Sequence, residues 1–441
     1  MRGHCARLVL GLLSAAAAAE ASVETDVGLG PRGVALAGSR AARPGSYDAV
    51  FYNPAGLAPG GATSEQGGHL ELELGALYGR PVVHATRADG TPLPAATTPD
   101  LAGAVLGMRF SVGQPFGVDG LDAGVAVWLP SRLFRWNIVP DDDPHWWLLT
   151  DRHQVVSAHF GLGWRIDRWL SIGAALRVGF DVETFTRGEV TDVTVGPDPQ
   201  SGKNVIRAGT QFGTDATVYG TVSPLFGVLL TPVDQLRIGL VYRHQSVVDD
   251  WGETRASGVP GLGNLGYGHR FTHYFEPSSF TAAVSADLAP GLDVSVDVTL
   301  HRYGDATTTN MDFFGPGRFG DTLSPAAGVS YRTSAATSLL LGYRFAPSPV
   351  DNLGGPTNLL DNDRHNIGLG SELRLAPLLG APALDAKLVF GVQHQIFVER
   401  SEHKDFRRFT DDEALEGNPG YPSYRHGGHL LVGTVGLEAR W

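Results

Sequence analysis

The chain has 441 residues, a formal net charge of −12, 58 glycines and a single cysteine. Such a length suits two or three soluble domains or one large β architecture. The acidic balance argues against a nucleic-acid partner, which would require a basic face. A charged fraction of 18% excludes a bundle of membrane helices.

The start of the chain has the composition of a secretory signal peptide, to which we assign residues 1–21. A basic segment containing Arg2 and Arg7 precedes the apolar run Leu8–Leu13 and the small residues Ala15–Ala19. This order is typical of export signals; the alternative is a buried N-terminal helix. Cys5 lies inside this segment, so the mature chain would contain no cysteine, which suits an envelope protein in an oxidising compartment.

Apolar and polar residues alternate strictly in many segments of the mature chain. In Leu292–Leu300 every even position is apolar and every odd position is polar, and similar rows cover Val156–Ile166 and Leu170–Val182. A period of two gives a strand one apolar face and one wet face. A soluble sandwich would alternate too, but these segments reach about ten residues, the length that crosses a bilayer at a tilt. Their wet rows hold Arg, Glu, Asp and Gly, as a polar lumen would.

No apolar stretch of about 18 residues follows the signal peptide, so a membrane location would require a closed barrel. We predict an all-β fold, a transmembrane antiparallel barrel of about fourteen strands over residues 67–441, in the bacterial outer membrane. The expected strands are His69–Tyr78, Leu101–Val112, Gly120–Leu129, His153–Ile166, Arg168–Thr184, Ala216–Leu230, Gln235–Val247, Phe275–Leu288, Leu292–Tyr303, Thr322–Arg332, Ala336–Ala346, Asp363–Leu375, Asp385–Glu399 and His426–Trp441.

The connections between these strands alternate in length. The short turns are Gly113–Asp119, Asp167, Thr231–Asp234, Ala289–Gly291 and Thr333–Ala335. The long loops are Gly79–Asp100, Pro130–Arg152, Phe185–Asp215, Val248–Tyr274, Gly304–Asp321, Pro347–Asn362 and Arg400–Arg425. Ala376–Leu384 alone departs from the pattern. Short turns at one end and long loops at the other are typical of outer-membrane barrels.

The final strand ends in an aromatic residue on its apolar face. Leu431, Val435, Leu437 and Trp441 share that face. We expect Trp441 to be the signal through which barrel-assembly machinery recognises the chain.

Residues 22–66 precede the first strand and show no alternation. They contain the Gly-rich run Gly30–Ser39 and the segment Asp48–Ala58. Small residues and tight-turn chemistry indicate a compact plug. Pro54 also forces Asn53 out of the helical region and fixes a turn there.

The Gly-rich run followed by Tyr52–Ala58 resembles the N-terminal hatch of the FadL/TodX family. The stretches Gly342–Pro349 and Asp361–His365 are similar to that family as well, and the strand count matches. The resemblance implies a hatch centred on Asn53, Pro54, Ala55 and Gly56. It also implies a monomeric outer-membrane transporter for hydrophobic molecules, either long-chain fatty acids or aromatic hydrocarbons. The chain departs from the family at Gly45 and Ser46, where an acidic pair is common.

The resemblance further implies a route in which the hatch shifts and the molecule leaves sideways, through an inward kink in the third strand, into outer-membrane lipid. Gly120 and Gly124 are the candidate kink residues, because glycine in a strand often marks a bend. Trp128 shares the inward face with Gly124. An apolar outer loop would capture the molecule or, equally, form an aromatic girdle at the lipid interface. Its residues are Leu133, Phe134, Trp136, Trp146 and Trp147.

Two other functions remain open: a general porin for polar solutes, and an outer-membrane enzyme or adhesin. We read no catalytic, cofactor or metal site. The GxGxxG matches at Gly28–Gly33 and Gly261–Gly266 do not lie between a strand and a helix, as a dinucleotide site requires. Asp141–Asp143 is interpreted as a solvated acidic loop, and His244, His301 and His394 lack ligand spacing. The inward arginines are interpreted as structural partners of acids; they are Arg109, Arg177, Arg243 and Arg344.

Overall fold

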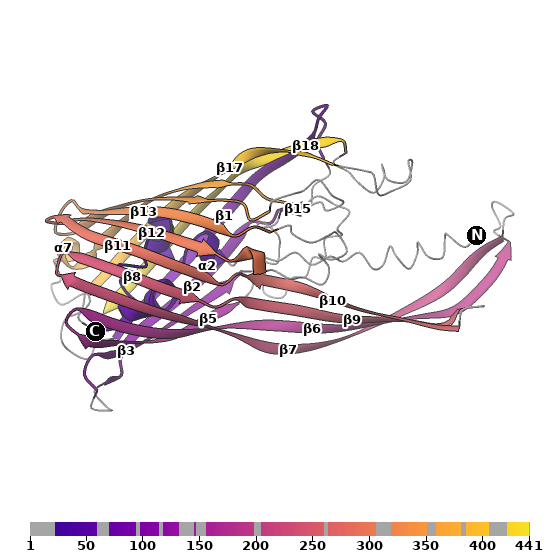
Figure 1. Ribbon diagram of the computed structural model, residues 1–441, viewed down its shortest axis with the longest axis horizontal. Coiled ribbons are helices and arrows are strands. Elements are labelled where there is room, and N and C mark those ends of the chain that lie inside the picture. The colour runs from indigo at the N-terminus through magenta and orange to yellow at the C-terminus, as the bar shows by residue number, and fades with distance from the viewer. Residues whose placement is uncertain are drawn as a thin grey trace.

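The computed structural model describes residues 23–59, 70–93, 98–113, 118–131, 145–146, 156–197, 204–259, 263–305, 319–350, 359–380, 385–404 and 421–440. Within them, fourteen strands form one closed antiparallel barrel (Figure 1). Strand β1 pairs with β18, Glu71 opposite Arg440, and this pairing closes the barrel. The strand number predicted from alternation is confirmed. Among the described helices, none has the length and apolar content to cross a membrane.

The barrel strands follow one another around the wall in chain order. They are β1 (Leu70–Arg87), β2 (Leu101–Ser111), β3 (Leu121–Pro130), β5 (Ser157–Asp167), β6 (Leu170–Pro197), β7 (Asn204–Val233), β8 (Leu236–Arg243), β11 (Ser279–Ala289), β12 (Leu292–His301), β13 (Thr322–Arg332), β14 (Thr337–Ala346), β16 (Arg364–Arg374), β17 (Asp385–His403) and β18 (Ser423–Arg440).

The apolar row of each strand points away from the barrel. Leu339, Leu341 and Tyr343 of β14 are all exposed, and the same alternation runs through the other strands. Such a belt is unfavourable in water and suits contact with lipid. The short connections gather at one end of the barrel, together with helix α7 (Leu375–Leu379), and we call this the turn end (Figure 1). The opposite end is called the loop end.

Several predicted loops are strands in the structure. Strands β6 and β7 stay paired to Pro197 opposite Asn204, where the sequence indicated the loop Phe185–Asp215. The expected loop Val248–Tyr274 is a hairpin of β9 (Ser246–Val259) and β10 (Gly263–Glu276). These strands extend beyond the rest of the barrel at the loop end (Figure 1). Alternation did not predict these strands, because the sequence there does not give one apolar face and one wet face. The strands form nonetheless, because pairing satisfies the backbone N–H and C=O groups whatever the side-chain pattern.

The remaining differences are smaller. Strand β1 continues to Arg87, into the predicted loop Gly79–Asp100. The expected loops Pro130–Arg152 and Pro347–Asn362 contribute β4 (His145–Trp146) and β15 (Leu359–Leu360), which pair in parallel. The predicted boundaries of the signal peptide and hatch, at residues 21 and 66, lie outside the described residues, as does Trp441.

The segment before β1 lies inside the barrel (Figure 1). It forms three short helices and a 3-10 turn, and nearly all its described residues are buried. These elements are α2 (Val23–Asp26), α3 (Gly30–Ala35), α4 (Ala49–Tyr52) and η1 (Pro54–Leu57). We call residues 23–59 the hatch. A short chain with this little regular structure depends on contacts with the barrel wall for its conformation.

Candidate functional site

The Asn53–Gly56 motif is a fixed turn that docks on strand β7. The Asn53 side-chain oxygen accepts a hydrogen bond from the Ala55 backbone N–H at 3.1 Å and caps η1. The Asn53 amide donates to the Ala41 carbonyl at 2.8 Å and to the Val228 carbonyl at 3.1 Å. The motif therefore joins two parts of the hatch to each other and to the wall.

Glycines on the inner wall make room for the hatch. A Cβ atom on Gly173 would overlap the Pro54–Ala55 peptide, and one on Gly227 would overlap the Asn53 side chain. The same holds around the barrel for Gly107, Gly124, Gly163, Gly239, Gly342, Gly368, Gly391 and Gly436. The sequence showed these glycines only as members of polar rows, and their regular placement on those rows was the available signal. They let the hatch backbone approach the wall closely, as glycine in a strand often does.

Arg32 of α3 is the centre of an ion-pair cluster near the turn end. Its guanidinium lies 2.6 Å from a Glu438 oxygen and 3.6 Å from a Glu73 oxygen, and it also pairs with Glu372. The three carboxylates come from β18, β1 and β16. Burial alone would lower the pKa of Arg32, but the charges of Glu372, Glu438 and Glu73 outweigh it and raise that pKa. Arg32 thus connects the hatch to three strands.

Asp297 of β12 holds the next stretch of the hatch. Its carboxylate accepts hydrogen bonds from the backbone N–H groups of Arg40, at 3.0 Å, and Ala41, at 2.8 Å, and from the Ser39 hydroxyl at 3.0 Å. Arg40 in turn pairs with Asp48 at 2.7 Å within the hatch. One barrel carboxylate therefore satisfies three hatch donors, which fixes the register of the segment.

Helix α2 is surrounded by cations and amides on one side. Arg364 donates two hydrogen bonds to one Asp26 oxygen, each 3.2 Å long. Arg344 donates to the Thr25 carbonyl at 2.7 Å and also to the Asp26 carbonyl. Gln395 donates to that Asp26 carbonyl at 3.1 Å. Because Asp26 is buried, its carboxylate depends on Arg364, while Arg344 and Gln395 satisfy the helix carbonyls.

Glu24 fixes α2 to strand β5. Its carboxylate accepts a hydrogen bond from the Ser157 hydroxyl and lies 3.6 Å from the His159 ring nitrogen Nε2. Burial alone would raise the pKa of Glu24, but the hydrogen bond with His159 and the charge of Arg177 hold it at about 2. Glu24 is therefore ionised throughout the physiological pH range.

All four inward arginines named in the sequence have partners in the structure. Arg109 pairs with Asp122 at 3.1 Å, Arg177 pairs with Glu276, and Arg243 lies 3.5 Å from Glu276. Arg344 binds α2 as described above. Arg243 also donates to the Phe51 carbonyl at 2.8 Å and lies 4.1 Å above the Phe51 ring. Arg109, Arg177 and Arg243 are thus partners of acids, as interpreted, whereas Arg344 binds backbone carbonyls of the hatch.

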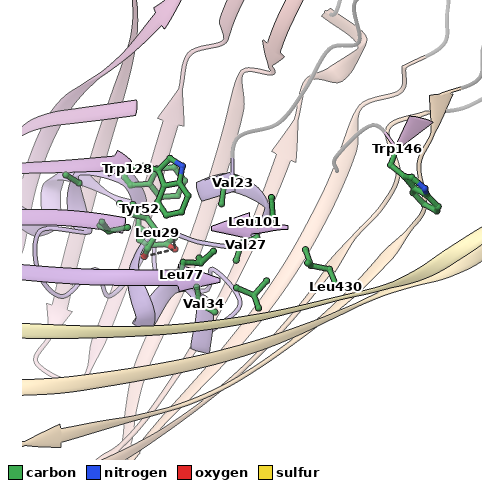
Figure 2. Packing of buried hydrophobic residues seen from close by; sticks show 14 of the residues in the cluster. Val23, Val27, Leu29, Val34, Tyr52, Leu77, Leu101, Trp128, Trp146 and Leu430 are labelled. Atoms are coloured by element: carbon green, nitrogen blue, oxygen red, sulfur yellow. Dashed lines mark hydrogen bonds between the residues drawn. The ribbon is translucent and has the colours of Figure 1, made fainter. Parts of the chain in front are cut away.

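The other side of the hatch faces an apolar lining on β1, β2, β3, β17 and β18. Figure 2 shows this cluster running from Trp146 past Leu430 and Val27 to Tyr52 and Trp128. Its wall members are Leu77, Ala85, Leu101, Val105, Ala126, Trp128, Phe397, Tyr424, Leu430 and Val432. Its hatch members include Val23, Val27, Leu29, Val34, Val50, Tyr52 and Leu57. The lining therefore connects a loop-end residue to the hatch without a charged interruption in the cluster.

The residues expected to form a lateral exit lie beside the hatch. Gly120 has φ +78° in the turn before β3, and Gly124 faces Leu57 and Val50 of the hatch. Trp128 is 2% exposed and belongs to the apolar lining. Strand β3 pairs with β2 from Asp122 to Pro130, and with β5 from Leu121 to Trp128, in both cases without a register shift. The described strand is therefore closed on both sides.

Of the expected capture loop, only Trp146 is within the described residues; Leu133, Phe134, Trp136 and Trp147 lie outside them. Trp146 is 3% exposed and packs on Phe397 and His426, with ring centroids 5.9 Å and 5.6 Å away. It therefore lines the interior, and a ligand would reach it from within the barrel or after the β4–β15 pair opens.

The described part of the chain contains no cluster of His, Cys, Asp and Glu suited to a metal ion. Gly28–Gly33, the first GxGxxG match, begins in the connection after α2 and continues into α3, inside the hatch. The second match is partly outside the described residues, and Gly263 begins β10.

A closed β-barrel with an apolar exterior and a hatch packed in its lumen defines the class, a plugged barrel of the outer-membrane type. TodX, a toluene transporter of P. putida, has this fold with a TM-score of 0.58 and 14% identity, over 94% of this chain and 99% of that chain. A Pseudomonas aeruginosa FadL homologue has a TM-score of 0.55 and 13% identity, over 93% of this chain and 98% of that chain. The Ralstonia pickettii toluene transporter TbuX has a TM-score of 0.53 and 14% identity, over 94% of this chain and 99% of that chain.

At these identities the likeness establishes the fold, and the chain has the fold of the FadL/TodX channels. No protein-family description matches the sequence, and no curated protein does.

Proposed function

We propose that this chain is a bacterial outer-membrane channel for the passive uptake of hydrophobic molecules. The observation that carries the proposal is the apolar lining that runs from Trp146 to the hatch helix α2. A general porin needs a water-filled lumen, whereas here hatch atoms approach the wall on most strands. An apolar lining that ends at the hatch suits a solute whose transfer out of water is favourable.

The substrate class proposed is long-chain fatty acids or aromatic hydrocarbons. Solved channels of this fold include transporters of toluene and a channel, CymD, for monoaromatic hydrocarbons. Arg364 and Arg177 are paired with Asp26 and Glu276, and Arg344 binds the α2 carbonyls, so these cations do not select between a carboxylate and a neutral ring. A mass spectrum of the lipophiles extracted from the purified protein would identify the bound class.

The proposed route has four steps: capture by the outer loop, binding on the apolar lining, movement of the hatch, and exit at the third strand into lipid. The exit is supported by the position of Trp128 and Gly124 next to the hatch residues Leu57 and Val50. An apolar solute gains nothing by entering the aqueous periplasm when the bilayer is adjacent. Because β3 is closed on both sides, exit requires local separation of β3 from β2 or β5.

Disulfide locking tests the exit without disturbing the hatch. Val127 and Ala158 are opposite each other on the lipid-facing rows of β3 and β5, so the pair Val127→Cys/Ala158→Cys would join the two strands. A matched lock on the far side is Val329→Cys/Leu341→Cys, which joins β13 and β14. The β3–β5 lock should abolish uptake, with recovery on reduction, if the molecule leaves through that seam, and the β13–β14 lock should not affect uptake in either case. Unchanged uptake through the oxidised β3–β5 lock would eliminate that seam as the exit.

Single-channel recording tests the hatched state against the porin alternative. The wild-type protein in a planar bilayer should show no steady ion current, because the hatch and the wall are in contact around the lumen. A stable open conductance would instead favour a porin for polar solutes.

A further inference from the structure

Helix α7 differs in composition from the other connections at the turn end. It spans Leu375–Leu379 between β16 and β17 and ends at Gly380, whose φ of +62° gives a left-handed cap. Leu378 is 57% exposed and Leu379 is 66% exposed. The sequence from residue 375 to 384 contains only Leu, Ala, Pro and Gly; of the other turns at this end, only the short Ala289–Gly291 also has no charged or hydroxyl side chain. An exposed, uncharged helix of this kind is unfavourable in water.

The apolar surface of α7 continues the lipid-facing belt. Leu373 and Leu388 are opposite each other on β16 and β17, directly before and after the connection. Further from the turn, the exposed Leu369 and Phe390 extend the same outward rows. The outward rows of β16 and β17 thus lead to the helix, with Ser371 as the polar member of the β16 row between Leu369 and Leu373.

Aromatic side chains are exposed at the turn end on other described strands. Trp164 of β5, Trp169 in the β5–β6 turn and Tyr331 of β13 are exposed there, where interfacial aromatic residues are common. The described turn-end residues of β14, β16, β17 and β18 include no outward Trp or Tyr. Among the described residues, β16 and β17 therefore carry no such anchor at the turn end; Tyr331 lies two strands away on β13, and Trp441 at the end of β18 is outside the described residues.

We infer that α7 lies in the interfacial region of the inner leaflet of the outer membrane and anchors the turn end of β16 and β17 there. Leu378 and Leu379 enter the acyl boundary, in the manner of an interfacial apolar segment. The cap at Gly380 then turns the chain back toward β17. The inference rests on the membrane location within the proposed function.

Site-directed spin labelling in proteoliposomes tests this anchor, and the mature chain suits it because Cys5 is the single cysteine of the sequence. Labels would be placed with Leu378→Cys and Leu379→Cys in a Cys5→Ser background, and power saturation measured with oxygen and with a water-soluble nickel chelate. Leu369→Cys is the lipid control and Ser334→Cys, in the β13–β14 turn, is the aqueous control. All four positions are on the surface, so the substitutions leave the packing of the barrel unchanged.

The labels at Leu378 and Leu379 should have an oxygen-to-nickel accessibility ratio close to that at Leu369 and severalfold above that at Ser334. An aqueous ratio at both α7 positions, with a lipid ratio at Leu369, would overturn the anchor, leave the proposed function intact and make a periplasmic protein the better occupant. An aqueous ratio at Leu369 itself would contradict the membrane location and with it the proposed function.

Discussion

Helix α2 lies between two unlike parts of the barrel wall. On one side Arg344 and Arg364 bind its carbonyls and the Asp26 carboxylate. On the other side Val23 and Val27 pack in the apolar lining with Leu101 and Leu430. Ionic contacts in a buried site are directional and costly to break, whereas apolar contacts can be exchanged for a hydrophobic molecule at little cost. For the proposed uptake route, we infer that the ionic contacts set the position of the hatch and that the apolar contacts leave it responsive to the ligand.

The largest expected effect comes from removing the cation at the centre of the ionic contacts. Arg32→Met would leave Glu73, Glu372 and Glu438 buried without their common partner, at a cost of about 3–5 kcal/mol. Denaturant unfolding should show the lower free energy of unfolding. Single-channel recording should show a new steady conductance, because the hatch leaves its position in the lumen. Arg32→Lys, which keeps the charge, is the control. Wild-type stability in Arg32→Met would show that these contacts do not set the position of the hatch.

An added side chain at the glycine wall should have the next largest effect. Gly173→Val would place methyl groups on the Pro54–Ala55 peptide, and overpacking of this kind costs about 1–3 kcal/mol. Hydrogen exchange in the hatch should increase. Gly433→Ala is the matched control, because no atom lies within 4 Å of a Cβ there. Equal exchange in the two variants would contradict close packing of the hatch on the wall.

A polar substitution in the apolar lining should reduce ligand binding while the hatch keeps its position. Val83→Thr replaces a methyl of a half-buried side chain that packs against the lining with a hydroxyl, which costs about 1–2 kcal/mol where a hydrophobic ligand covers it. Titration with a fluorescent fatty acid should show roughly tenfold weaker binding, with no new conductance. A new conductance with normal binding would reverse the roles assigned to the two kinds of contact.

The smallest effect is expected at Glu24. Its pKa in the folded protein is about 2, below the ordinary value of 4.5, so its ionised form stabilises the docked hatch. That contribution is complete above pH 4.5 and is lost as the pH falls from 4.5 toward 2. Glu24→Gln should weaken hatch docking by about 1 kcal/mol at pH 7. Hydrogen exchange of residues 23–35 should therefore differ between the two proteins at pH 7 and converge at about pH 2.

The barrel could be predicted from the sequence because each lipid-crossing strand carries a period of two. Leu292–Leu300 shows that period, and β12 is where it was expected. The hatch location followed from Asn53–Pro54 and the family resemblance. The hairpin β9–β10 was missed, because pairing beyond the membrane does not require alternation.

The contacts of the hatch could not be predicted for a different reason. The partners of Arg32 come from β1, β16 and β18, far from it in the sequence, and a buried ion pair leaves no local pattern. Gly173 and Gly227 belong to polar rows in the sequence. The sequence alone does not distinguish a glycine that faces water from one that contacts the hatch. Which acids and arginines meet depends on the closure of the whole barrel.

The most direct test of hydrophobic uptake compares hydrophobic solutes with a polar one in the same cells. Bacteria lacking their own uptake channels would express this protein, and the entry of a radiolabelled long-chain fatty acid, of radiolabelled toluene and of a small sugar would be measured. The account predicts that expression accelerates one or both hydrophobic solutes severalfold and leaves sugar entry at the background rate. Faster sugar entry without any gain for either hydrophobic solute would contradict it.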